Sequence, residues 1–381
     1  MDPNTSQIYS DYEKIIPHEK LSQFLFNDIL AFEKLSWVKD IGEESFCQVF
    51  QSIIQKHNRF RLPFVFLDKF FLKLYIKKNK KNKKNILFQS SKYLDVILEV
   101  KKYYNVGLII NGKKERLFTA KNFVGYVGVD DLAQYVLNYL KEKNVKYLYQ
   151  LIKEIEDKLT AVKPDYIVLW NDAQPVERAI VLVSKKLGIT TIEVQHGIYL
   201  PPVLPFTTGR VVDYVLVWGQ YFKDLYVKQN IRKPEDIYVL GYPYLVKKEK
   251  FIENENKKYT ICCLGEAFER FDKNFLPITL SNINSLSEMC KKLGFKFIYR
   301  PHPGDYRELL KKNLTDVQFT DIGEKLKETF RRADIFISFA STASVEAAMN
   351  GKISLQLMNY PLKLDNFEKL GICDKSFENI I

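Results

Sequence analysis

The chain of 381 residues is longer than one ordinary domain and suits two domains of roughly 150 residues each. Hydrophobic residues make up 46% of it, but no stretch approaches the roughly 20 uncharged apolar residues that would cross a bilayer. Lys and Arg outnumber Asp and Glu by 58 to 46, and the net charge of +12 favours an anionic partner. The five cysteines form no CxxC pair, so neither a disulfide framework nor a zinc site is expected.

Residues 1–85 are expected to form a helical N-terminal segment packed on the first lobe. No basic stretch followed by an apolar one marks a secretory signal, so the expected location is cytoplasmic. Within 61–85, Phe and Leu alternate with Lys before a Lys/Asn run. This pattern fits either an amphipathic element at the inner face of an anionic membrane or a core helix followed by a solvated loop. The second interpretation is favoured because charge runs are usually solvated.

Residues 86–245 alternate short β-rich segments with helical ones, which is typical of a parallel sheet flanked by helices. Helices are expected at 130–159 and 175–188, and the second should stop at Gly188. Strands are expected at 85–89, 105–110, 165–172, 190–197, 213–219 and 236–243.

A polar linker precedes a second alternation in residues 246–381, which predicts a second parallel α/β domain. Helices are expected at 324–333 and 343–352, with another between the first two strands. Strands are expected at 260–265, 295–303, 317–321, 335–342 and 353–358.

Ligands of open parallel sheets bind beyond the carboxyl ends of the strands, and polar residues gather there in this chain. In the first domain these residues are Asn171, Asp172, Gln195, His196 and Gly197. In the second domain they are Gly265, Glu266, Arg300, His302, Pro303, Ser338, Ser341, Thr342 and Glu346.

The motif RPHPGD presents Arg300 and His302 from a turn that Pro301 and Pro303 stiffen. Arg300 is suited to hold phosphate oxygens in a bidentate manner, and His302 to donate a hydrogen bond to a departing phosphate. The alternative is a purely structural turn in which Arg300 pairs with Asp305.

The motif SFASTASVEAAMNGK predicts a strand, a turn of small residues and a helix that opens at Ser341 or Thr342. The free amides of such a helix start form an anion site, and Glu346 is placed to accept hydrogen bonds from two vicinal hydroxyls. The alternative is an ordinary N-capped helix.

In the first domain, Asp172 is a candidate nucleophile or base, with the competing role of capping the next helix. His196 is a candidate acid, base or phosphate ligand, and a structural histidine is its alternative. Asn171, Gln195 and Gly197 are expected on the acceptor side. No DxD, HExxH, GxxxxGK[ST] or GxGxxG motif stands in a suitable place, so no metal and no cofactor are expected.

The combination of QHG, YRPHP and SFASTASVEAAMNGK resembles bacterial surface and capsule polysaccharide glycosyltransferases of the GT-B fold, over roughly residues 86–381. Kdo transferases, bacterial sialyltransferases and CDP-glycerol glycerophosphotransferases have comparable His-Pro stretches. The resemblance implies two Rossmann-like, doubly wound domains facing a cleft, with acceptor bound by 86–245 and nucleotide by 246–381.

The sequence therefore predicts a metal-independent glycosyltransferase that moves a sugar from a nucleotide donor to a surface polysaccharide or glycolipid. A CMP-linked acidic sugar is the expected donor, and a peripheral contact with an anionic membrane is a further expectation. A CDP-glycerol-type transferase and a UDP-sugar 2-epimerase are the alternatives. Nucleic acid is not expected as a partner, because the Lys-rich run lacks the interleaved aromatic residues of a single-strand platform.

Overall fold

The computed structural model describes residues 12, 15–17, 20–26, 82–89, 94–110, 125–128, 132–199, 209–242, 258–268, 274–360 and 365–378. The predicted amphipathic element at 61–85 falls mostly outside these residues, and a short helix at 20–26 is what they include of the predicted N-terminal helices. The chain divides into two compact units. Of the described residues, those up to 196 and 209–242 belong to the first unit, and 197–199 and those from 258 onward belong to the second.

The first unit is built on a seven-stranded sheet in the order β3-β2-β1-β4-β5-β6-β7. All its strand pairs are parallel, and the direction of strand addition reverses between β1 and β4, where Leu87 stands opposite Ile167. This reversal is the switch point at which doubly wound folds bind ligands. The strands are β1 (Asn85–Phe88), β2 (Asn105–Ile110), β3 (Gly125–Gly128), β4 (Tyr166–Leu169), β5 (Thr190–Val194), β6 (Tyr214–Val217) and β7 (Ile237–Val239).

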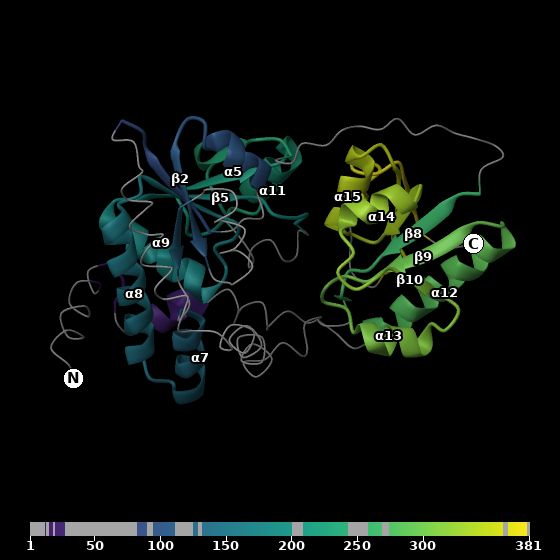
Figure 1. The fold of residues 1–381 in the computed structure, drawn as a ribbon, viewed down its shortest axis with the longest axis horizontal. Coiled ribbons are helices and arrows are strands. Elements are labelled where there is room, and N and C mark those ends of the chain that lie inside the picture. The colour runs from purple at the N-terminus through teal and green to yellow at the C-terminus, as the bar shows by residue number, and fades with distance from the viewer. Residues whose placement is uncertain are drawn as a thin grey trace. The chain divides into compact units, whose positions relative to one another are not determined.

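The helices of the first unit are α5 (Leu94–Val100), α7 (Leu132–Glu142), α8 (Lys146–Val162), α9 (Pro175–Leu187) and α11 (Gln220–Lys228), with a 3-10 turn at Pro234–Asp236. The prediction of one helix over 130–159 was wrong, because Lys143 adopts a left-handed conformation (φ 52°) that separates α7 from α8. The predicted stop at Gly188 is confirmed, since this residue caps α9 with a φ of 68°. Figure 1 shows α7, α8 and α9 beside the first sheet.

The second unit is built on a six-stranded parallel sheet in the order β10-β9-β8-β11-β12-β13. Its strands are β8 (Thr260–Leu264), β9 (Lys296–Arg300), β10 (Gln318–Phe319), β11 (Ile335–Ser338), β12 (Ile353–Leu357) and β13 (Lys375–Phe377). Its helices are α12 (Phe275–Lys292), α13 (Arg307–Asn313), α14 (Leu326–Arg332) and α15 (Thr342–Met349).

Successive residues of β8 supply two separate cores, because side chains of a strand alternate between the faces of its sheet. Cys263 packs with residues of α12 and α13 on one face, whereas Cys262 packs with residues of α14 and α15 on the other. Figure 1 shows the two helix pairs on opposite sides of this sheet. Both units are therefore doubly wound, Rossmann-like α/β folds, as the sequence predicts. The predicted domain boundaries stay predictions.

Within the described residues, no helix combines the length and the apolar character needed to cross a membrane.

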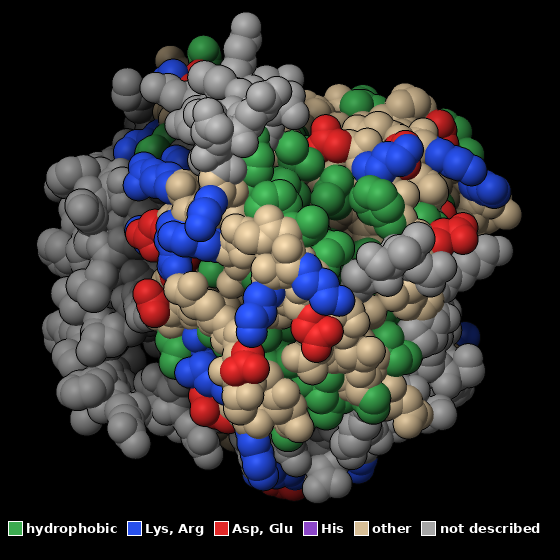
Figure 2. All heavy atoms as spheres, turned by 90° about the vertical axis from the view of Figure 1, so that its right-hand side faces the viewer, with side chains coloured by type: hydrophobic (Ala, Val, Ile, Leu, Met, Phe, Trp, Pro, Cys, Tyr) green, Lys and Arg blue, Asp and Glu red, His purple; other side chains and the backbone are tan. Residues whose placement is uncertain are grey.

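Figure 2 shows one face of the molecule, on which blue and red side chains are interspersed among hydrophobic ones. The excess of positive charge does not form a continuous basic surface among the described residues on that face.

Candidate functional site

The turn after β9 is built around the buried carboxylate of Asp305, which is 9% exposed. Its Oδ2 accepts hydrogen bonds from the Tyr299 hydroxyl (2.7 Å) and from the backbone N–H of His302 (2.8 Å). The N–H of Asp305 donates in return to the carbonyl of His302 (3.0 Å). Burial raises the pKa of Asp305, while these donors act in the opposite direction. Asp305 thus holds the turn, and it does not pair with Arg300.

His302 presents its imidazole from this turn and is exposed to solvent. The Gly304 N–H donates to Nδ1 of the ring at 3.0 Å. Because Nδ1 acts as an acceptor, the neutral ring carries its proton on Nε2. His302 is therefore fixed as an exposed Nε2–H donor, which is suited to an anionic ligand.

Gly265 follows β8 and lies directly against the turn. A Cβ atom at this position would come within 2.7 Å of the His302 backbone nitrogen and 2.5 Å of the Tyr299 hydroxyl oxygen. Only glycine allows the ends of β8 and β9 to approach so closely.

Glu266 fills the loop between β11 and α15 with its own carboxylate. Oε1 accepts hydrogen bonds from the N–H groups of Phe339 (2.6 Å) and Ala340 (2.8 Å), and Oε2 accepts from Ala340 (2.9 Å). Burial raises the pKa of Glu266 to about 8, and the backbone amides act against that rise. The amides of the loop just before α15 thus hold an internal acid, whereas the sequence assigns the phosphate to the amides of the helix start itself.

The start of α15 follows this loop. Ser341 is the N-cap, and its hydroxyl accepts from the Ala343 N–H at 3.3 Å. The hydroxyl of the buried Ser338 accepts from the Ser341 N–H at 3.4 Å. The Thr342 hydroxyl accepts from the N–H of Ile198 at 3.0 Å, within the second unit.

Gly197, the glycine of QHG, lies against the hydroxyl of Thr342. A Cβ atom at position 197 would be 3.2 Å from Oγ1 of Thr342, closer than is usual in packed proteins, so this contact favours a glycine. Glu346 lies one turn further along α15 and is half-buried.

Arg300 turns its guanidinium away from the His302 turn. Nη1 donates to the Thr329 hydroxyl (2.6 Å), and Nη2 donates to the Glu324 carbonyl (2.9 Å). These bonds connect the end of β9 to α14. The role of Arg300 as a phosphate ligand stays a prediction, and its contacts favour a positioning role instead.

In the first unit, Asp172 follows β4 and is 0% exposed. Its Oδ2 accepts from the N–H groups of Val211 (2.6 Å) and Val212 (3.2 Å), while Oδ1 has no hydrogen-bond partner. Glu193 in β5, also 0% exposed, accepts from the Gly209 N–H (2.9 Å) with Oε2, and its Oε1 likewise has no partner. Burial first, and then the neighbouring Asp172 carboxylate, raise the pKa of Glu193 well above its usual value. The pair is satisfied when one proton lies between the two free oxygens.

Two amides predicted to bind acceptor are engaged within the protein. Asn171 is buried, and its Oδ1 accepts from the Ala173 N–H at 3.2 Å. Gln195 is buried, and its Oε1 accepts from the backbone N–H of Trp218 at 2.8 Å. His196 is half-buried and meets the ring of Trp170 edge-on, with 5.0 Å between ring centroids.

The structure brings the predicted residues of the second unit to one edge, because β9, β8 and β11 are neighbours in the sheet. At this edge lie the turn of His302, Pro303 and Gly304, the residues Gly265 and Glu266, and the start of α15. Pro303 is exposed on the turn. The sequence did not indicate Tyr299 as the partner of Asp305, or Glu193 as the neighbour of Asp172. A charged residue within the apolar strand TTIEV is the signal that could have identified Glu193. Among the described residues, no group of three His, Cys, Asp or Glu side chains converges as a metal site.

No protein-family profile matches the chain, and no curated protein sequence does. Its fold is similar to that of UDP-GlcNAc 2-epimerase from Methanocaldococcus jannaschii, with 15% identity, 78% of this chain and 89% of that chain covered, and a TM-score of 0.53. It is also similar to UDP-GlcNAc 2-epimerase from Neisseria meningitidis bound to UDP-GlcNAc, with 13% identity, coverage of 78% and 88%, and a TM-score of 0.50. The lipopolysaccharide outer core galactosyltransferase WaaB matches with 11% identity, coverage of 78% and 87%, and a TM-score of 0.49. The likeness to the two epimerases shows that the chain has the two-domain α/β fold of GT-B type that the sequence predicts.

Proposed function

We propose that the protein is a glycosyltransferase that takes a nucleotide-activated sugar as donor and a surface glycan or glycolipid as acceptor. The observation that carries this proposal is the exposed His302 imidazole, fixed as a hydrogen-bond donor at the carboxyl edge of a doubly wound sheet. Ligands of such sheets bind at this edge.

The second unit binds the nucleotide in this proposal. His302 donates Nε2–H to a phosphate oxygen, and the positive end of α15 adds a favourable field. Glu346 accepts hydrogen bonds from the ribose hydroxyls. As the bond to the sugar breaks, negative charge builds on the departing phosphate, and donors already in place lower the barrier most effectively.

The first unit contributes the group that removes the acceptor proton. Asp172 is buried beneath the backbone at 211–212, whereas His196 is partly exposed at the neighbouring strand end. An imidazole titrates near neutral pH and is suited to general base catalysis. We therefore assign the base to His196 and a supporting structural role to Asp172.

A UDP-sugar 2-epimerase is the second candidate, because the fold is similar to two such enzymes, one of them bound to UDP-GlcNAc. Epimerisation needs several acid and base groups around one sugar. Three carboxyl groups of the first unit, Asp172, Glu177 and Glu193, are buried and hydrogen-bonded. This arrangement favours the transferase.

The sequence resemblance favours a CMP-linked acidic sugar as the donor. The epimerase from Neisseria meningitidis, by contrast, is bound to a UDP-sugar. A location at the inner face of the cytoplasmic membrane, next to a glycolipid acceptor, belongs to the same proposal.

Calorimetric titration with CMP, UDP and CDP-glycerol tests the proposal and identifies the donor class. We expect one nucleotide to bind the wild-type protein and to bind His302→Ala at least tenfold more weakly, since a hydrogen bond to a charged group contributes roughly 1.5–3 kcal/mol. The control is Lys312→Gln, an exposed residue outside the site. Release of a free epimerised sugar from UDP-GlcNAc would favour the second candidate. If no nucleotide binds, the proposed function is wrong.

A further inference from the structure

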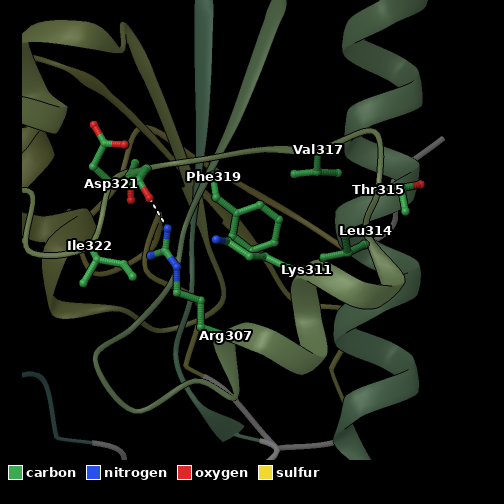
Figure 3. A pocket seen from close by; sticks show the side chains of 9 residues that line it. Arg307, Lys311, Leu314, Thr315, Val317, Phe319, Asp321 and Ile322 are labelled. Carbon is green, nitrogen blue, oxygen red and sulfur yellow. Dashed lines mark hydrogen bonds between the residues drawn. The ribbon is translucent and has the colours of Figure 1, made fainter.

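A hollow lies between α13 and the segment that contains β10 (Figure 3). Its volume is about 580 Å³, within the range of roughly 300–1,000 Å³ that is common for ligand pockets. None of its lining residues belongs to the cluster around His302 and α15. The hollow therefore has no role in the proposed nucleotide site.

Arg307, at the start of α13, provides a fixed cation in this hollow. Nη2 donates to the Thr320 carbonyl, and the guanidinium lies over the ring of Phe319, 5.7 Å from its centroid. The Phe319 ring is itself held edge-on by Tyr299, with 5.5 Å between centroids. Nε of Arg307 is buried and has no acceptor. Because Nε is enclosed, a ligand in the hollow would contact the guanidinium through its Nη groups.

Lys311 stands four residues after Arg307, so both side chains lie on the same face of α13. Both line the hollow, and Figure 3 shows the Lys311 amine beside the Phe319 ring on the side of Arg307. Two like charges at this spacing repel each other. Asp321 also lines the hollow. With two cations and one carboxylate the lining carries a net charge of +1, which favours an anion as ligand.

The rest of the hollow is partly apolar and is suited to the uncharged part of the molecule that bears the anion. The Phe319 ring contributes a half-buried apolar wall. Ile322, which is 79% exposed, has the highest exposure among the large hydrophobic residues of the described chain. Ile322 therefore adds an exposed apolar side chain to the rim of the hollow. A phosphate on a ring or a lipid headgroup would place the charge on Arg307 and Lys311, with its C–H groups against Phe319 and Ile322.

We propose that the hollow between α13 and β10 is a second anion-binding site, which takes a phosphate monoester or diester group. It is separate from the nucleotide site and does not depend on the proposed function.

Saturation-transfer NMR with glucose 6-phosphate tests the site, with glucose as the matched ligand without phosphate. We expect a signal for glucose 6-phosphate that persists in excess CMP and UDP. Substituting Arg307→Gln and Lys311→Gln together should weaken binding at least tenfold, because two charge-assisted hydrogen bonds are lost. Lys311→Glu alone, at an exposed position, should weaken it severalfold. The control variant Lys312→Gln should bind as the wild type does.

Sedimentation with vesicles distinguishes the source of the phosphate. Vesicles of phosphatidylglycerol and phosphatidylcholine are compared with vesicles of phosphatidylcholine alone. Binding to the anionic vesicles that the double variant loses would identify a lipid headgroup, and binding of glucose 6-phosphate without vesicle binding would identify a soluble phosphate ester. The proposal would be overturned if the double variant and Lys311→Glu bound the probes as tightly as the wild type. It would also be overturned if the wild type bound neither glucose 6-phosphate nor the anionic vesicles.

Discussion

Replacing Glu193 by Gln should abolish the proton uptake that we expect when folding buries Glu193 next to Asp172. In the unfolded chain both carboxyls ionise with ordinary pKa values near 4. In the folded protein both are 0% exposed, each keeps one oxygen without a donor, and the pKa of Glu193 is raised well above its usual value, mainly by burial. Folding therefore takes up a proton as long as the pH lies between the unfolded pKa of Glu193 and its raised folded pKa. A glutamine has the shape of the protonated acid and can donate to Asp172 without that proton.

The direction in which stability changes with pH follows from the raised pKa of Glu193. The stability contributed by protonated Glu193 is fully present below the unfolded pKa and is lost as the pH rises through the folded one. One proton taken up corresponds to a slope of about 1.4 kcal/mol per pH unit. From about pH 5.5 upward, the wild type should thus lose stability relative to Glu193→Gln, at up to this slope, until the pH passes the folded pKa.

Urea unfolding followed by tryptophan fluorescence measures this difference, since Trp170 and Trp218 both lie in the first unit. The control is Glu154→Gln, which removes a partly exposed carboxylate paired with Lys158 on α8 and should leave the slope unchanged. A difference between Glu193→Gln and wild type that stays constant over this pH range would refute the shared proton.

Three further outcomes test the second unit. Gly265→Ala should lower the free energy of unfolding by roughly 1–3 kcal/mol, because the new methyl group meets the His302 backbone; unchanged thermal unfolding would contradict this packing. His302→Ala should leave the melting temperature unchanged, since its ring is exposed, while nucleotide affinity measured by calorimetry falls at least tenfold; equal affinity would exclude His302 as a ligand. Arg300→Gln should destabilise the second unit by roughly 1–3 kcal/mol through loss of its bonds to Thr329 and Glu324; a loss of nucleotide affinity without a loss of stability would instead favour direct phosphate binding.

Most of the fold was predictable from local patterns. Short β-rich segments such as TICCL are buried on both faces and stand out as apolar runs between helical stretches. The short edge strands β3 and β13 were missed, because GYVG and KSF carry no such pattern and owe their conformation to pairing with β2 and β12. The break between α7 and α8 was also missed, since Lys143 has no sequence signature for a left-handed conformation.

The site was predictable in location but less so in detail. Strand ends indicated which residues gather at one edge, because parallel strands share that edge. The direction of a side chain depends on tertiary partners, so the bonds from Arg300 to Thr329 and Glu324 left no trace in the sequence. The contact between Glu266 and the loop after β11 joins residues 73 positions apart, and no local pattern encodes it.

The Glu266 carboxylate gives the loop before α15 its shape without help from any ligand. Where loops of this kind depend on a bound phosphate, they order only on binding and the affinity is reduced by the entropy of ordering. Here three hydrogen bonds from Glu266 already hold the amides of Phe339 and Ala340 in place. A ligand that binds beside this loop would therefore pay little entropy for ordering it.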